Sequence, residues 1–173
     1  RHNPTQTFAY RFDWDNAPSS WLADFPALLG AGHGLEISFI FGDFEKGMSI
    51  PYLNTEDNLD DRLTLSNAMM NYWGNFAHHG TPASGSNGKL PEWKPWASST
   101  ENLMLLDGSE DQGVAMTTLR LSAADLKQRF AEDSQIQSQQ ERCQLYAQSF
   151  LVSFQAQDFW NESEYKGYGD GGC

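Results

Sequence analysis

The sequence predicts a fold that combines strands and helices around an aromatic core, and three patterns indicate it. Large aromatic side chains alternate with small or charged ones over residues 7–14, which is the period of a strand with one buried face. Apolar side chains recur at helical spacing over residues 60–79. Two short apolar runs, at residues 103–107 and 114–119, are joined by a turn that contains glycine and predict two further strands.

The composition is that of a folded, acidic domain. The 173 residues are 39% hydrophobic and include six Trp and eleven Phe, which need a core to bury them. The net charge of −12 repels a phosphate backbone and argues against nucleic-acid partners. No apolar run reaches the roughly 20 residues that a membrane span needs. The acidic balance slightly favours a secreted or periplasmic location over a cytoplasmic one.

The part of the chain between the first strand and the long helix is irregular. A turn is expected at residues 15–20 and a short apolar stretch at residues 21–29. Residues 30–34 contain three glycines, which is too many for a stable helix. Residues 36–42 are apolar and aromatic, so the glycine-rich loop is interpreted as lying between buried strands, with Phe39 and Phe41 in the core.

The helix predicted over residues 60–79 has one apolar face and a marked end. Gly80 and Pro82 stop it. Its apolar face is expected to contain four side chains at helical spacing: Leu65, Met69, Tyr72 and Phe76.

The C-terminal part predicts a second helical region. Ser122 is expected to cap a long polar helix that reaches Phe159 and has a break at residues 133–134. Residues 161–173 are expected to form a flexible tail. The two cysteines, Cys143 and Cys173, could pair with each other, pair elsewhere or stay reduced.

His33 is the candidate catalytic residue. A general base must reach a nucleophile on one side and an orienting carboxylate on the other, and a glycine-rich loop lets the backbone come close enough. An imidazole that titrates near neutrality can act first as a base and then as an acid. On spacing alone, a histidine between glycines is more often a turn residue or a structural one.

Several ordered motifs resemble the type-B carboxylesterases and cholinesterases. Residues 25–42 read FPALLGAGHGLEISFIFG and are similar to the catalytic-histidine segment of that family. The next family helix resembles residues 72–82, YWGNFAHHGTP, and the tryptophan turn and strand after it resemble residues 91–96 and 103–107. The run YRFDW at residues 10–14 is similar to the strand before the histidine loop, in a form associated with bacterial members.

The resemblance implies an α/β-hydrolase fold with a mixed central sheet flanked by helices, here incomplete on its own. Residues 1–160 would be the C-terminal third of one domain. The Ser nucleophile, the acid and the oxyanion hole would lie on an N-terminal portion of the same protein, because the chain contains no Gly-x-Ser-x-Gly. The expected activity is hydrolysis of a small carboxylic ester through an acyl-enzyme, and the isolated chain is expected to be inactive.

The resemblance also implies roles for residues around His33, the triad base. Glu36, with Gly34, would help to hold the loop, although Glu36 could be a surface carboxylate. Phe25 and Leu35 would line the substrate pocket, or simply pack in the core.

No cofactor and no metal are expected. His78 and His79 lie at a helix end, where their interaction with the helix dipole is the better explanation. The tryptophan turn is assigned to core packing rather than to carbohydrate binding. Cys143 resembles a family cysteine that pairs with one further upstream, so its partner would lie outside this chain.

Two other functions compete with the esterase. One is a catalytically inactive, cholinesterase-like adhesion or scaffold domain, since such relatives lose triad residues. The other is a free-standing binding fragment, which would leave its first strand as an open edge and its aromatics facing water.

Overall fold

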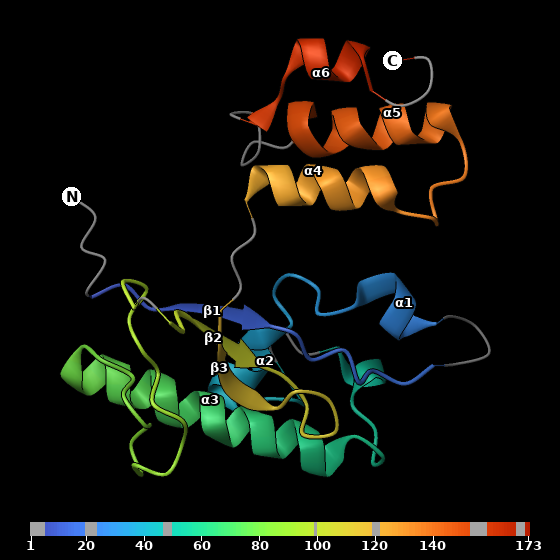
Figure 1. Ribbon diagram of the computed structural model, residues 1–173. Coiled ribbons are helices and arrows are strands. Elements are labelled where there is room, and N and C mark those ends of the chain that lie inside the picture. Colours follow the sequence, from blue (N-terminus) through green and yellow to red (C-terminus); the bar gives the residue numbers. More distant parts are fainter. Residues whose placement is uncertain are drawn as a thin grey trace. The chain divides into compact units, whose positions relative to one another are not determined.

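The computed structural model divides the chain into two compact units, residues 1–119 and 120–173 (Figure 1). The assignment of residues 1–160 to part of one α/β-hydrolase domain, with a tail at residues 161–173, stays a prediction. The structure describes residues 6–19, 24–46, 50–98, 100–118, 122–152, 159–168 and 172–173. The predictions for Trp21, for Leu119 and for part of the long C-terminal helix lie outside these ranges.

A three-stranded sheet forms the centre of the first unit. Its order is β1 (Ala9–Phe12), β2 (Leu103–Leu106) and β3 (Val114–Thr117). β1 runs parallel to β2, and β2 runs antiparallel to β3. All three strands were predicted from the sequence. Among the described residues, β1 has a partner strand on one edge only, so it forms one border of the sheet.

Helix α3 (Leu59–His79) is the longest element and matches the predicted helix. It ends at Gly80, whose φ of 72° is the left-handed conformation that suits glycine. Of the predicted apolar face, Leu65, Met69 and Tyr72 are almost fully buried, whereas Phe76 is 47% exposed. Phe76 still lies on the same face of the helix, since its ring packs edge to face on Phe8 with the ring centroids 6.1 Å apart.

Two short helices flank the glycine-rich segment, and one of them corrects the sequence interpretation. Helix α1 spans Phe25–Leu29, α2 spans Glu36–Phe41, and a 3₁₀ turn, η1, spans Pro51–Leu53. Residues 36–42 were interpreted as a strand because of their apolar, aromatic composition. In the helix that they form, only one side faces the core, so Phe39 is 2% exposed while Phe41 is 75% exposed. The assignment of Phe41 to the core is wrong.

The core of the first unit joins the sheet to α2 and α3. Every residue of β2 is buried, as expected for the central strand. The buried cluster comprises Trp14, Phe39, Leu65, Met69, Tyr72, Trp93, Met104 and Leu106. The tryptophan turn contributes only one of its two rings, since Trp93 is buried and Trp96 is 41% exposed.

Asp61, in the first turn of α3, ties this helix to two loops. Its Oδ2 accepts hydrogen bonds from Trp14 Nε1 and Asn16 Nδ2, each at 3.1 Å. Its Oδ1 accepts from the backbone N and the Oγ of Ser109, at 2.6 and 2.8 Å. Burial disfavours the ionised carboxylate, but these hydrogen bonds outweigh burial and lower the pKa of Asp61. A side chain at Gly108 would collide with Asp61 and Asn16.

The second unit is helical. It contains α4 (Ala123–Glu132), α5 (Gln139–Ala147), a π-helical turn η2 (Gln148–Val152) and α6 (Glu162–Lys166). Ser122 caps α4 as predicted: it accepts from the backbone of Asp125, whose carboxylate accepts from the Ser122 backbone in return. The break between α4 and α5 falls at the predicted place. In the segment predicted as a flexible tail, residues 162–166 instead form α6.

The two cysteines pair with each other. Cys143 on α5 forms a disulfide with Cys173, which corrects the expectation that its partner lies outside the chain. The second unit has its own aromatic core, made by Tyr146, Phe150 and Tyr168. No helix among the described residues is long and apolar enough to span a membrane.

Candidate functional site

His33 lies on the segment that connects α1 to α2. Asp24 caps α1 by accepting a hydrogen bond from the backbone of Ala27 at 3.2 Å. The helix ends after one turn, where the backbone N of Gly30 donates to Pro26 O at 2.9 Å with a φ of 49° at the glycine. The chain then turns back toward the core, with the backbone N of Leu35 bonded to Gly32 O at 3.2 Å.

Glu36 closes the turn that follows His33. The backbone N of Gly34 donates to Glu36 Oε2 at 2.9 Å, across two residues. Gly34 has a φ of 90°, a conformation that side-chain-bearing residues rarely adopt. A Cβ at this position would meet no atom within 4 Å, so the requirement for glycine here comes from the backbone and not from crowding.

The predicted site residues differ in their exposure. His33 is exposed, while Phe25, Leu35 and Glu36 are half-buried. Among the described residues, the His33 imidazole has no hydrogen-bond partner. Phe25 and Leu35 belong to the elements on either side of the histidine, one opening α1 and the other preceding α2. The geometry therefore presents an imidazole outward from a turn with a defined backbone.

Helix α2 anchors this turn to the core. The Phe39 ring packs against Phe12, Trp14 and Phe44, with ring centroids 5.0 to 5.1 Å apart. Ser66 Oγ on α3 donates to Phe39 O at 2.8 Å. Because Phe39 is three residues beyond Glu36, these contacts position the start of α2 and with it the histidine turn.

Tyr10 on β1 is electrostatically coupled to Glu36, a link that the sequence did not reveal. Its pKa is raised, first by burial and then by the negative charge of Glu36. The strand before the histidine loop and the carboxylate that closes the loop thus share an environment. Alternation had placed Tyr10 on the aromatic face of β1, but nothing in the sequence pointed to Glu36 as its neighbour.

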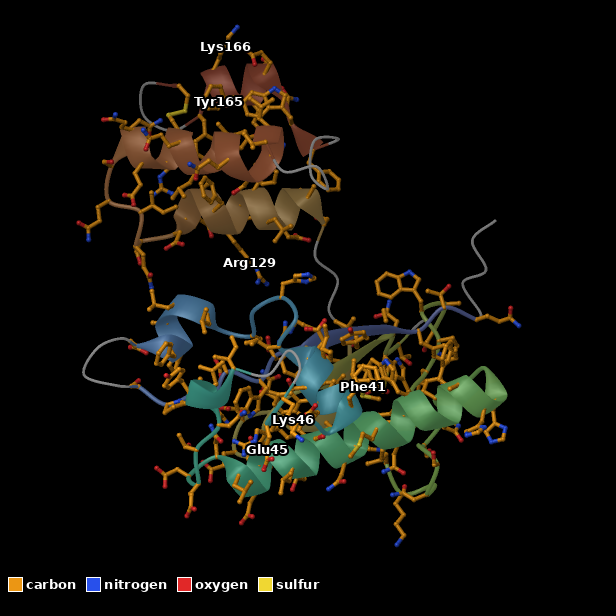
Figure 2. All side chains as sticks on the ribbon, turned by 180° about the vertical axis from the view of Figure 1, so that it is seen from behind. Phe41, Glu45, Lys46, Arg129, Tyr165 and Lys166 are labelled. Carbon is orange, nitrogen blue, oxygen red and sulfur yellow. A yellow bond between two sulfur atoms is a disulfide. The ribbon has the colours of Figure 1, made fainter. Side chains whose placement is uncertain are left out.

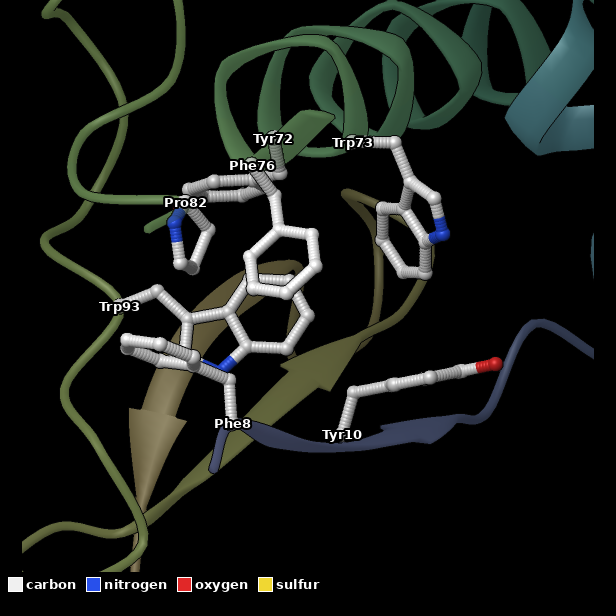
Figure 3. A pocket seen from close by; sticks show the side chains of 7 residues that line it. All are labelled: Phe8, Tyr10, Tyr72, Trp73, Phe76, Pro82 and Trp93. Carbon is white, nitrogen blue, oxygen red and sulfur yellow. The ribbon is translucent and has the colours of Figure 1, made fainter. Parts of the chain in front are cut away.

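An aromatic pocket of about 180 Å³ opens beside β1 (Figure 3). Phe8 and Tyr10 rise from the strand region toward Trp73 and Phe76 of α3 (Figure 3). The complete lining is Phe8, Tyr10, Tyr72, Trp73, Phe76, Pro82 and Trp93. Its rings meet edge to face, with the Tyr10 and Trp73 centroids 5.2 Å apart. The pocket is a preformed apolar surface at the border of the sheet.

Metal-binding geometry is not found in the described part of the chain. It contains no group of three or more His, Cys, Asp or Glu side chains that could hold an ion. His78 and His79 lie in the last turn of α3, with ring centroids 6.1 Å apart.

Comparison with known proteins identifies the family. The model of the carboxylesterase family matches residues 1–127. The chain is 34% identical over 94 residues to acetylcholinesterase of Gallus gallus, covering 54% of this chain and 11% of that protein. It is 33% identical over 112 residues to acylcarnitine hydrolase of Rattus norvegicus, covering 65% of this chain and 18% of that protein. It is 41% identical over 92 residues to carboxylesterase 4A of Bos taurus, covering 53% of this chain and 14% of that protein.

The chain thus spans less than a fifth of the length of these relatives. Its small mixed sheet with flanking helices is consistent with part of an α/β-hydrolase domain. The chain belongs to the carboxylesterase family.

Proposed function

We propose that His33 is the general base of a serine carboxylesterase whose other catalytic groups lie on another portion of the protein. The observation that carries the proposal is the turn at residues 30–36. An exposed imidazole stands there on a glycine-rich backbone closed by Glu36, within the part of the chain that matches the carboxylesterase family. An ester hydrolase needs such a base, accessible to a hydroxyl and held by its surroundings.

The reaction would proceed in two halves. A serine hydroxyl attacks the ester carbonyl while the His33 imidazole takes its proton, and a backbone oxyanion hole stabilises the negative oxygen. The imidazolium then gives that proton to the leaving alkoxide, which departs as the alcohol. In the second half His33 takes a proton from water as the water oxygen attacks the acyl carbon. The imidazolium then returns that proton to the serine oxygen as the acyl–serine bond breaks and the acid product leaves.

The neighbours of His33 have supporting roles in this proposal. Glu36 and Gly34 are positioning residues, because their hydrogen bond fixes the backbone directly after the histidine. Phe25 and Leu35 flank His33 in sequence and are half-buried, so they are the apolar groups best placed to contact the acyl or alcohol part of a small ester.

We further propose that the portion carrying the serine adds to the sheet at β1. This strand has an unpaired edge among the described residues, with the aromatic pocket next to it. An added strand would satisfy the open backbone groups and could place an apolar side chain in the pocket. Because the His33 segment comes after β1 in the chain, the same contact would bring the catalytic groups of that portion toward His33.

The test combines mass and activity. The protein purified from its source would be weighed under native conditions and again after denaturation and reduction, and assayed with p-nitrophenyl butyrate. We expect the 173 residues to travel with the rest of the domain, as one longer chain or as two, and the assembly alone to hydrolyse the ester. Release of the isolated chain should abolish activity.

Two variants test the proposed contact at β1. Tyr10→Asp places a charge at the border strand and should weaken association with the companion portion. Tyr52→Asp makes the same change on the exposed turn η1 and should not. If an active assembly does not form, or if the assembly forms but shows no hydrolysis, the inactive scaffold becomes the better description of this protein.

A further inference from the structure

A groove of about 840 Å³ opens at the far end of α2 from His33. It lies between the segment that follows α2 and the first turns of α3, on the side where Figure 2 labels Phe41, Glu45 and Lys46. The described lining is Gly42, Asp43, Phe44, Glu45, Lys46, Asn54, Leu59, Arg62 and Leu63. Its size is in the range of small-molecule sites, about 300–1,000 Å³.

Arg62, one of the lining residues, is a buried cation without an acidic partner. Arg62 is only 6% exposed, and its guanidinium forms no ion pair with any described Asp or Glu. Nη1 donates to Asn58 Oδ1 and to Thr55 O, the latter at 3.4 Å. Nε is buried without an acceptor. Burial lowers the pKa of this guanidinium, which reflects the cost of a buried charge that nothing neutralises.

The surroundings of Arg62 suit an anion that carries an apolar chain. The guanidinium carbon lies over the Phe44 ring, 4.9 Å from its centroid, in a cation–π contact. Leu59 and Leu63, one turn apart on α3, are exposed large apolar side chains along the groove. An apolar chain would bury these two leucines, while its charged end would neutralise Arg62.

Two carboxylates also line the groove, and they limit what an anion can gain. Asp43 Oδ1 accepts hydrogen bonds from the backbone N of Glu45 at 3.2 Å and of Lys46 at 2.9 Å, so its charge is engaged in its own turn. Glu45 and Lys46 are both exposed and of opposite sign, so they largely offset each other. Arg62 is the buried charge among these four.

We infer that this groove binds a small amphipathic carboxylate, with the carboxylate at Arg62 and the apolar chain along Leu59 and Leu63. A guanidinium is the side chain best matched to a carboxylate, and charge-assisted hydrogen bonds are stronger than neutral ones. The site is separate from the His33 turn, since α2 lies between them. It therefore does not depend on the proposed esterase activity.

The test uses decanoate and 1-decanol as probes on the full chain, with binding followed by calorimetry and by NMR of the Leu methyl groups. We expect decanoate to bind at least about tenfold more tightly than the alcohol, the difference a charge-assisted contact supplies. The methyl signals of Leu59 and Leu63 should shift with decanoate. Equal affinity for the two probes, or shifts confined to other leucines, would overturn the inference.

Variants separate charge from folding. Arg62→Gln should weaken decanoate binding about tenfold while leaving 1-decanol unchanged. Lys89→Gln removes the same charge from an exposed loop position and should leave both affinities unchanged. Glu45→Gln leaves Arg62 and its contacts intact and should tighten decanoate binding slightly. If Arg62→Gln does not fold, the wild-type comparison of the two probes and the Glu45→Gln result still decide the question.

Discussion

The backbone N–H of Gly34 donates to Glu36 Oε2 at 2.9 Å, so one carboxylate closes the turn directly after His33. The helix that begins with Glu36 is in turn fixed to the core by Phe39, whose carbonyl accepts from Ser66. The position of His33 thus depends on contacts that can be changed without touching the imidazole.

Removing the Glu36 acceptor should loosen the turn. Glu36→Ala leaves the Gly34 N–H without its partner, so we expect faster hydrogen exchange at that amide. In the complete enzyme kcat should fall by about 10- to 100-fold with a smaller change in KM, because a misplaced base slows the chemistry. Glu36→Gln keeps a carbonyl oxygen that can accept from the Gly34 N–H. This variant should retain most of the protection of that amide and most of kcat. An unchanged exchange rate at the Gly34 amide in Glu36→Ala would show that Glu36 does not hold the turn after His33.

The positive φ of Gly34 makes a prediction about stability. Gly34→Ala should destabilise the first unit by about 1–2 kcal/mol, because alanine is strained at a φ of 90°. Gly74→Ala is the matched control. Its new Cβ would meet Ser86 Oγ at an ordinary 3.5 Å, and helix α3 should gain about 0.5–1 kcal/mol. Urea unfolding followed by Trp fluorescence measures the free energy of unfolding of both variants. Changes of the same sign in the two variants would contradict the claim that the backbone requires glycine at position 34.

Asp61 should stabilise the first unit in a pH-dependent way. Its pKa is lowered in the folded state, so the unfolded chain binds its proton more readily. The contribution of the carboxylate is therefore present above its unfolded pKa and is lost as pH falls through the folded pKa. Asp61→Asn should cost about 1–3 kcal/mol at pH 7, since four hydrogen bonds weaken, and much less in acid.

The neighbouring Asp60 is the control for that measurement. It is exposed, and Asp60→Asn removes the same charge from the same helix turn. Urea midpoints at pH 7 and in acid should show a pH-dependent difference for Asp61→Asn only. A similar pH dependence in Asp60→Asn would mean that the helix dipole, rather than the hydrogen bonds, is responsible.

The disulfide should matter to the second unit alone. Cys143 and Cys173 are 30 residues apart, and closing a loop of that length stabilises by about 3.6 kcal/mol. Cys143→Ser with Cys173→Ser, or reduction of the native chain, should lower the thermal midpoint of the signal from Tyr146 and its neighbours in near-UV circular dichroism. The Trp14 and Trp93 environments should keep their midpoint, since both lie in the first unit.

Elements with a clear sequence pattern could be predicted from the sequence, including the three short strands, whereas the short helix α2 could not. Alternation found β1, helical spacing found α3, and Ser122 marked the start of α4. Residues 36–41 were misinterpreted because an apolar run of six residues has too little periodicity to distinguish a strand from a helix. The exposure of Phe41 follows from that error.

Contacts between distant residues were out of reach for the same sequence reasoning. Asp61 collects donors from residues 45 to 48 positions away, and spacing gives no sign of them. Spacing left the cysteine pairing open, and the family resemblance pointed to a partner outside the chain, which is wrong. Arg62 drew no attention in the sequence, because only its burial without an ion-pair partner among the described residues singles it out.

The central claim is that His33 is the general base, and the most direct test is kcat/KM for p-nitrophenyl butyrate in the complete enzyme carrying His33→Ala or His78→Ala. Loss of a triad histidine should reduce kcat/KM by about 10⁴- to 10⁶-fold, whereas His78, in the last turn of α3, should be replaceable with little effect. An enzyme that keeps its activity without His33, or loses it equally without His78, would contradict the account.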